Sequence, residues 1–129
     1  MVFAITAPYA AVLTVLMIIL TQHVIRERGK ANIGLGDGGS ILVLQAMRRQ
    51  ANFVENVPLA LILMILAEAG GSGAMTLNIL GLILVAARLI HPFGIKSAAP
   101  AHPARIIGAV ATNGVQLALV VILLMQHFA

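Results

Sequence analysis

The chain has 129 residues, of which 60% are hydrophobic and 9% are charged. An ordinary soluble domain has roughly 25% charged and 45–50% apolar residues, so this composition excludes a soluble globular protein. A mean hydropathy of +1.04 also excludes a disordered chain, because disorder requires low hydrophobicity and high net charge. The chain contains no cysteine, which excludes disulfides, a thiolate nucleophile and thiol-ligated metal sites.

Four apolar segments are long enough to be membrane-spanning helices. Residues 3–24 are almost uninterruptedly apolar, and at ~1.5 Å per residue they cover about 30 Å, the thickness of the hydrocarbon core of a bilayer. No Lys or Arg precedes this run, which favours a first span over a cleavable signal peptide. The other predicted spans are residues 41–68, 75–90 and 106–128. We therefore expect an all-α fold, an integral membrane four-helix bundle that forms one domain over residues 1–129.

The segments between the predicted spans carry turn and capping signals. Residues 70–73, three glycines and a serine, predict a short turn between the second and third helices. Residues 32–40 contain four glycines but no following Lys-Ser/Thr, which favours a flexible connector over a phosphate-binding loop. Pro103 suits the first turn of the fourth helix. Glu68, beside the short turn, is expected to be solvated.

The basic residues are distributed asymmetrically. Neither the second loop nor either terminus carries a Lys or Arg, whereas the first and third loops are bordered by Arg26, Arg28, Lys30, Arg48, Arg49, Arg88, Lys96 and Arg105. By the positive-inside rule, both long loops are expected to be cytoplasmic and both termini to lie on the other side. The sequence pI near 10.8 then reflects membrane topology, and no nucleic-acid partner is expected.

Polar residues follow one face of the second predicted helix. Gln45, Arg48, Asn52 and Glu55 are separated by 3, 4 and 3 positions, which places them on the same side of a helix. Ionisable groups within a span are costly and are functional candidates by default. A guanidinium, an amide and a carboxylate in this order suit a small zwitterion, whose carboxylate would meet Arg48 and whose ammonium would meet Glu55.

Two features lie beside this face. Pro58 removes a backbone hydrogen bond, so the helix is expected to bend near Glu55. Arg88 lies at a comparable depth in the third span, where a Glu55–Arg88 ion pair is plausible. Such a pair could hold the helices together without any ligand, so a structural network and a ligand site are both open at this point. The excess of arginines over carboxylates favours an anionic ligand or a lipid phosphate.

Other polar residues give weaker signals. His91 and His102 have no second ligand at i+3 or i+4, so no metal site is expected. Asn113 and Gln116 share a face of the fourth helix, where hydrogen bonding between helices is the expected role. His23 is expected to lie at a membrane surface.

The polar motif of the second span resembles that of the MAPEG family, the membrane-associated proteins in eicosanoid and glutathione metabolism. The chain length, the Gly-rich first loop and the Arg88-Leu89 ending of the third helix are also similar, so the likeness covers nearly the whole chain and is greatest to the short bacterial branch. The motif reads Arg48-x-Gln50-x-Asn52-x-x-Glu55-x-x-Pro58.

The resemblance implies a homotrimer with a glutathione site between neighbouring subunits, open toward the cytoplasm. By position, Arg48 and Arg28 would hold the glutathione carboxylates. Gln50 and Asn52 would hydrogen-bond the backbone of glutathione, and Glu55 would take the γ-glutamyl ammonium.

The resemblance also assigns residues near the third loop. Arg88 and His91 would belong to the glutathione site, and Arg105 is the nearest match to an arginine that stabilises the thiolate. A permanent cation near the sulfur lowers the thiol pKa, so that the nucleophilic form is present at neutral pH. Active members commonly carry tyrosines where this chain has His91 and Ile95, and Tyr9 is the sole tyrosine here.

Our leading hypothesis is a trimeric glutathione transferase or peroxidase-like protein of the bacterial inner membrane that conjugates lipophilic electrophiles. Glutathione would be the co-substrate, no metal is expected, and membrane lipids would be the surrounding partners. The alternatives are a small proton-coupled multidrug transporter, in which Glu55 would be the intramembrane carboxylate, and a non-catalytic lipid-binding oligomer.

Overall fold

The computed structural model describes residues 2–96 and 102–128, so the predicted domain ends at Met1 and Ala129 lie outside the described part of the chain. All regular structure within these residues is helical. The four long helices, α3 together with η1, are apolar and long enough to cross a membrane, which confirms the prediction of an all-α four-span protein. The elements are α1 (Thr6–Ala31), α2 (Ile41–Ala69), α3 (Ala74–Ile90), the short 3₁₀ helix η1 (His91–Gly94) and α4 (Pro103–Phe128).

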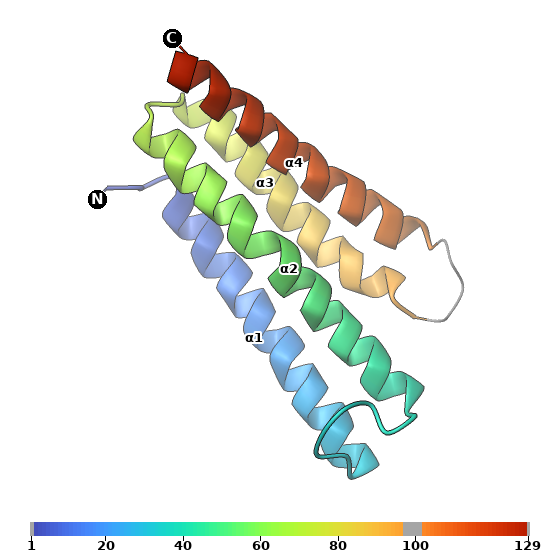
Figure 1. The fold of residues 1–129 in the computed structure, drawn as a ribbon. Helices are drawn as coiled ribbons and strands as arrows, with labels where there is room; N and C mark the ends of the chain where they lie inside the picture. The colour runs from blue at the N-terminus through green and yellow to red at the C-terminus, as the bar shows by residue number, and fades with distance from the viewer. Residues whose placement is uncertain (1, 97–101, 129) are drawn as a thin grey trace.

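The helices run up and down alongside one another (Figure 1). α1 packs mainly on α2, α4 packs on α3 and α2, and α1 also contacts α3. The two termini and the α2–α3 turn lie at one end, which we call the terminal end. The opposite end holds the α1–α2 loop, η1 and the start of α4, and we call it the basic end because it carries Arg26, Arg28, Lys30, Arg48, Arg49, Lys96 and Arg105.

Apolar side chains fill the space between the helices and also cover the outside of the bundle. Leu13, Met64, Leu84 and Leu119, one from each long helix, are buried in a common core. Every long helix also exposes large aliphatic residues, among them Ile18, Ile62, Leu82, Val110 and Leu124. In a protein of this hydropathy such a surface is covered by lipid or by further membrane-embedded chains.

The observed helix ends differ most from the prediction at α1. The helix continues seven residues past position 24, to Ala31, because its charged last turns are good helix formers that extend beyond the apolar core. Asn32 then ends it in the left-handed conformation, with φ of 54°. α2 continues through Pro58 without interruption, and Pro103 begins α4 as predicted.

The α1–α2 connection is a non-helical loop that is tied together internally. The backbone N–H of Gly39 donates to the Asp37 carboxylate at 2.9 Å, and that of Ser40 donates to the Asp37 carbonyl at 2.9 Å. The hydroxyl of Ser40 accepts from the N–H of Val43 at 3.5 Å and so caps α2.

Glu68, which was predicted to be solvated, is partly exposed and also caps the start of α1. Its carboxylate accepts hydrogen bonds from the backbone N–H groups of Ile5 and Thr6, both at 2.9 Å, and from the Thr6 hydroxyl at 2.6 Å. A carboxylate at a helix N-terminus satisfies otherwise unpaired N–H groups and interacts favourably with the helix dipole. Glu68 therefore fastens α1 to α2 at the terminal end.

Side-chain amides on α4 make further ties to α2. The Gln116 amide donates to the Asn56 carbonyl at 2.9 Å, which confirms the predicted interhelical bond. Asn113 is exposed and makes no hydrogen bond within the described residues. Nearer the terminal end, the Gln126 amide donates to the Ala67 carbonyl at 3.1 Å and to the Ser72 hydroxyl at 2.9 Å.

We expect Glu68→Gln to lower the stability of the bundle by about 1 kcal/mol, because the amide loses the charge that the α1 N-terminus favours. Thermal unfolding in detergent, followed by circular dichroism, measures the change. Glu55→Gln is the matched control, since Glu55 is exposed and has no described partner. Equal melting temperatures for the two variants would contradict a capping role.

Candidate functional site

A cavity of about 290 Å³ opens at the basic end where α2, η1 and α4 meet. We call it the α2–α4 cavity. Three of its residues come from the polar face of α2, two from η1 and the residue after it, and one from the first turn of α4. These six residues are Gln45, Arg48, Asn52, His91, Ile95 and Arg105, and Ile41 and Leu44 of α2 complete the lining.

The helical spacing on α2 explains why three of these side chains share one wall. Gln45, Arg48 and Asn52 are separated by 3 and 4 positions and line the α2–α4 cavity together, as the spacing predicted. Gln45 donates to the Lys96 carbonyl at 2.6 Å, which joins α2 to the segment after η1. Glu55, the fourth residue of the predicted face, is exposed and is not part of this cavity lining.

Two glycines bring His91 and Arg105 close together. A side chain at Gly94 would collide with the backbone of Arg105, and one at Gly108 would collide with the Cβ of His91 and the Ala87 carbonyl. α4 therefore packs directly against the end of α3 and against η1. This close approach places an imidazole and a guanidinium on the same cavity.

Arg88 is buried behind the α2–α4 cavity, with 2% of its surface exposed. Its guanidinium donates to the Asn52 side-chain oxygen at 2.9 Å and to the Gly108 carbonyl at 3.0 Å. The predicted Glu55–Arg88 ion pair is therefore wrong: Arg88 points into the bundle and bonds to neutral oxygens, whereas Glu55 lies on the outer surface. Arg88 orients the Asn52 amide in the cavity wall.

A second cavity, of about 380 Å³, lies between α1 and α2 and is here called the α1–α2 cavity. Arg28, Arg48 and Gln50 line it together with Thr21 and Met47. The Gln50 amide donates to the Thr21 hydroxyl at 2.8 Å, so it links α2 to α1. Arg48 borders both cavities.

The predicted site residues are therefore divided between two sides of α2. Asn52, His91 and Arg105 face the α2–α4 cavity, whereas Arg28 and Gln50 face the α1–α2 cavity. Within one chain, Arg48 is the predicted site residue that lines both cavities.

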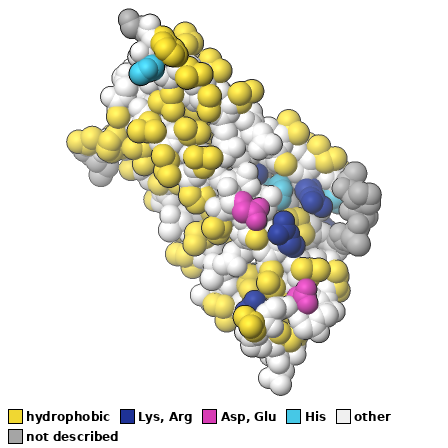
Figure 2. Space-filling view, viewed as in Figure 1, with side chains coloured by type: hydrophobic (Ala, Val, Ile, Leu, Met, Phe, Trp, Pro, Cys, Tyr) yellow, Lys and Arg dark blue, Asp and Glu magenta, His cyan; other side chains and the backbone are white. Residues whose placement is uncertain are grey.

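The polar cavities are electropositive. Among the described residues, no hydrogen bond or ion pair engages the side chains of Arg48 and Arg105. The ion pair between Lys30 and Glu27, at 2.7 Å, involves no residue of either cavity. Figure 2 shows charged side chains gathered toward the basic end, while the rest of that face is mainly apolar. The described residues contain no cluster of three or more His, Cys, Asp or Glu that could hold a metal ion. The arrangement suits an anionic ligand.

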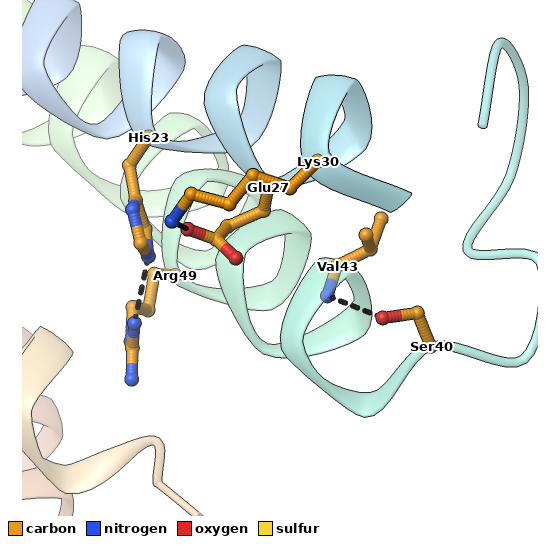
Figure 3. A network of polar contacts seen from close by, with 6 residues as sticks. All are labelled: His23, Glu27, Lys30, Ser40, Val43 and Arg49. Carbon is orange, nitrogen blue, oxygen red and sulfur yellow. Dashed lines mark hydrogen bonds and ion pairs between the residues drawn. The ribbon is translucent and has the colours of Figure 1, made fainter. Parts of the chain in front are cut away.

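Sequence reasoning missed the role of Arg49. Its guanidinium donates to the carbonyls of Pro92 at 3.0 Å and Ile95 at 2.5 Å, and its third contact is His23 Nε2 at 3.1 Å. Figure 3 shows Arg49 reaching from α2 toward His23 on α1. These bonds hold η1, and with it His91, against α2. The bonding partners of Arg49 lie more than twenty positions away in the sequence, so residue spacing within α2 could not identify them.

The fold and site together define an integral membrane protein of four helical spans with basic cavities at one end. Residues 6–125 match the sequence model of the MAPEG family. The chain is also 33% identical over 90 residues to the inner membrane protein YecN of Escherichia coli strain K12, covering 70% of this chain and 69% of that protein. YecN of E. coli O6:H1 strain CFT073 matches to the same extent. The chain belongs to the MAPEG family.

We expect Arg88→Met to destabilise the bundle by about 1–3 kcal/mol, because the hydrogen bonds of the buried guanidinium to the partly buried Asn52 and to the Gly108 carbonyl would be lost. Chemical unfolding of the detergent-solubilised protein measures the loss. Arg105→Met is the control, since it removes an exposed guanidinium from the same end and should change stability little. A loss of equal size in both variants would contradict the role assigned to Arg88.

Proposed function

We propose that the protein binds glutathione at its basic end and conjugates it to lipophilic electrophiles. The observation that carries the proposal is the α2–α4 cavity, which Arg48 and Asn52 of α2 line together with Arg105 of α4. Membership of the MAPEG family supports the same ligand. Under the positive-inside rule the basic end faces the cytoplasm, where a soluble thiol peptide can enter.

The charges of the site match those of glutathione. Arg48 supplies a planar guanidinium that can pair with a carboxylate through two parallel hydrogen bonds. Glu55 lies two turns deeper along α2, is exposed and has no described partner, so its carboxylate can take the γ-glutamyl ammonium. The side-chain N–H groups of Asn52 remain as donors to the peptide, because its oxygen already accepts from Arg88.

The arginines are the residues that would activate the glutathione thiol. A guanidinium beside the glutathione sulfur favours the thiolate and lowers the thiol pKa, and Arg105 is the exposed cation of the α2–α4 cavity closest in sequence to the third loop. The thiolate then forms a bond from sulfur to the electrophilic carbon while the leaving group departs with its electron pair. Tyr9 cannot assist, because its hydroxyl bonds to Asn78 at 2.7 Å and it belongs to the first turns of α1, at the terminal end.

The division of the site residues between two cavities is compatible with a ring of subunits that share their sites, such as the homotrimer that the family resemblance implies. If the α1–α2 cavity of one subunit faces the α2–α4 cavity of its neighbour, Arg28 and Gln50 of one chain meet Asn52 and Arg105 of the next. Such a head-to-tail contact repeats around a closed ring and makes one site per interface. The exposed aliphatic faces of the helices provide the surface for this contact and for access of electrophiles from the lipid.

Arg48→Ala is expected to weaken glutathione binding by about 2 kcal/mol or more, roughly 30-fold in Kd, because a charge-assisted contact is lost. Isothermal titration calorimetry in detergent measures the affinity. Lys30→Ala is the matched control, because Lys30 is a cation at the same end that pairs with Glu27 and borders neither cavity.

A thiol-conjugation assay on the same preparations separates the possible functions. Binding with conjugation supports a transferase, and binding without conjugation indicates a non-catalytic glutathione-binding protein, consistent with the absence of tyrosine at His91 and Ile95. If the wild-type protein binds no glutathione and instead drives drug-dependent proton flux in liposomes that Glu55→Gln abolishes, the protein is a transporter and the proposal is wrong.

Mixed oligomers test whether the site is shared between subunits. Arg28→Ala and Arg105→Ala should each impair glutathione binding as homo-oligomers. When the two variants are coexpressed, about a quarter of the sites should regain both arginines, because each site draws independently on two subunits of a cyclic assembly. Recovered binding in the mixture is measured by calorimetry, and absence of recovery would show that each site lies within one chain.

A further inference from the structure

A groove of about 490 Å³ lies on the side of the bundle formed by α1, α3 and η1, and the proposed glutathione site does not use it. We call it the α1–α3 groove. One side is a stripe along α1 made of Leu16, Ile19, His23 and Arg26, separated by 3, 4 and 3 positions, so these residues share one face of the helix. Leu89, Phe93 and Lys96 line the other side, and Arg49 of α2 completes the groove.

The groove changes from basic to apolar along its length. Its cations, Arg26, Arg49 and Lys96, come from the basic end, whereas Leu16 and Ile19 lie further along α1. Ten residues separate Leu16 from Arg26, which corresponds to about 15 Å of helix at ~1.5 Å per residue. This length is about half of a ~30 Å hydrocarbon core, so the groove matches one leaflet of a bilayer.

One carboxylate, that of Glu27, lies near the cations of the groove, which outnumber it. Glu27, next to Arg26 in sequence, accepts from Lys30 at 2.7 Å, and Figure 3 shows this pair beside the His23–Arg49 contact. No hydrogen bond or ion pair within the described residues occupies the side chains of Arg26 or Lys96. The basic end of the groove therefore carries a net positive charge.

His23 and Arg49 add hydrogen-bond donors to this charge. An arginine has no acceptor, so His23 must accept the contact from Arg49 through Nε2 and carry its proton on Nδ1. That N–H has no hydrogen-bond partner within the described residues and lies one helical turn from Arg26. Arg49 is itself held by the Pro92 and Ile95 carbonyls and cannot turn away from the groove without breaking these bonds.

We propose that the α1–α3 groove is a binding site for an anionic glycerophospholipid of the surrounding membrane. The lipid phosphate contacts Arg26 and Lys96, with donors from Arg49 and His23 deeper in the groove. One acyl chain lies along Leu16, Ile19 and Leu89. A water-soluble phosphate would use the cations but leave the apolar length of the groove unfilled, so the whole groove fits a lipid.

Native mass spectrometry of the detergent-solubilised protein tests this site. The protein is titrated with phosphatidylglycerol and with phosphatidylcholine of the same acyl chains. We expect phosphatidylglycerol to bind roughly tenfold more tightly, because two surface cations favour the anionic headgroup. The double variant Arg26→Gln/Lys96→Gln should lose this preference, whereas Lys30→Gln, which removes a neighbouring cation outside the groove, should keep it.

Additional titrations identify which molecule occupies the α1–α3 groove. Ile19→Asn should weaken the binding of both lipids, and glycerol phosphate should not compete with phosphatidylglycerol. Equal affinity for the two lipids in the wild-type protein, or full competition by glycerol phosphate, would overturn the proposal. A changed oligomer mass in the double variant with unchanged lipid preference would show that the groove is a contact between copies of the chain. Glutathione binding is measured separately and should be unaffected in the double variant.

Discussion

The basic end of the bundle depends on the hydrogen bonds of Arg88. Lipid offers no partner to a buried guanidinium, so the protein must supply the acceptors itself. Arg88 of α3 finds them on α2, at Asn52, and on α4, at Gly108. These two bonds join three helices around one charge and fix the wall of the α2–α4 cavity. The same charge makes that wall electropositive, which favours an anion in the cavity.

Composition and hydropathy were sufficient to predict four helical spans and to predict at which end of the bundle each loop between them lies. The helix ends were less predictable, because apolar runs mark the part of a helix within lipid and not its full length. α1 shows the difference: its last turn carries Arg28 and Lys30 beyond the apolar run. The 3-and-4 spacing on α2 correctly placed Gln45, Arg48 and Asn52 on one cavity, since that relation is set within a single helix.

The contacts between helices could not be predicted in the same way. Spacing says which residues share a face but not toward which neighbour that face turns. Arg88 therefore meets Asn52 and not Glu55, and Arg49 meets His23. Glu68 looked like a solvated residue at a turn because its partners, Ile5 and Thr6, lie more than sixty positions earlier. The family motif identified residues on both sides of α2, and the structure separates them into two cavities.

The Glu68 cap has a mechanical consequence for α1. The helix is held covalently at Lys30 and Ala31 by the loop to α2, and at its other end by three hydrogen bonds to one carboxylate. Between its ends α1 is also bonded to neighbouring helices at Tyr9, Thr21 and His23, so among the described residues its longest stretch without such a bond lies between Tyr9 and Thr21. A bulky molecule that binds beside this stretch is expected to bend α1 there and to leave both ends of the helix in place.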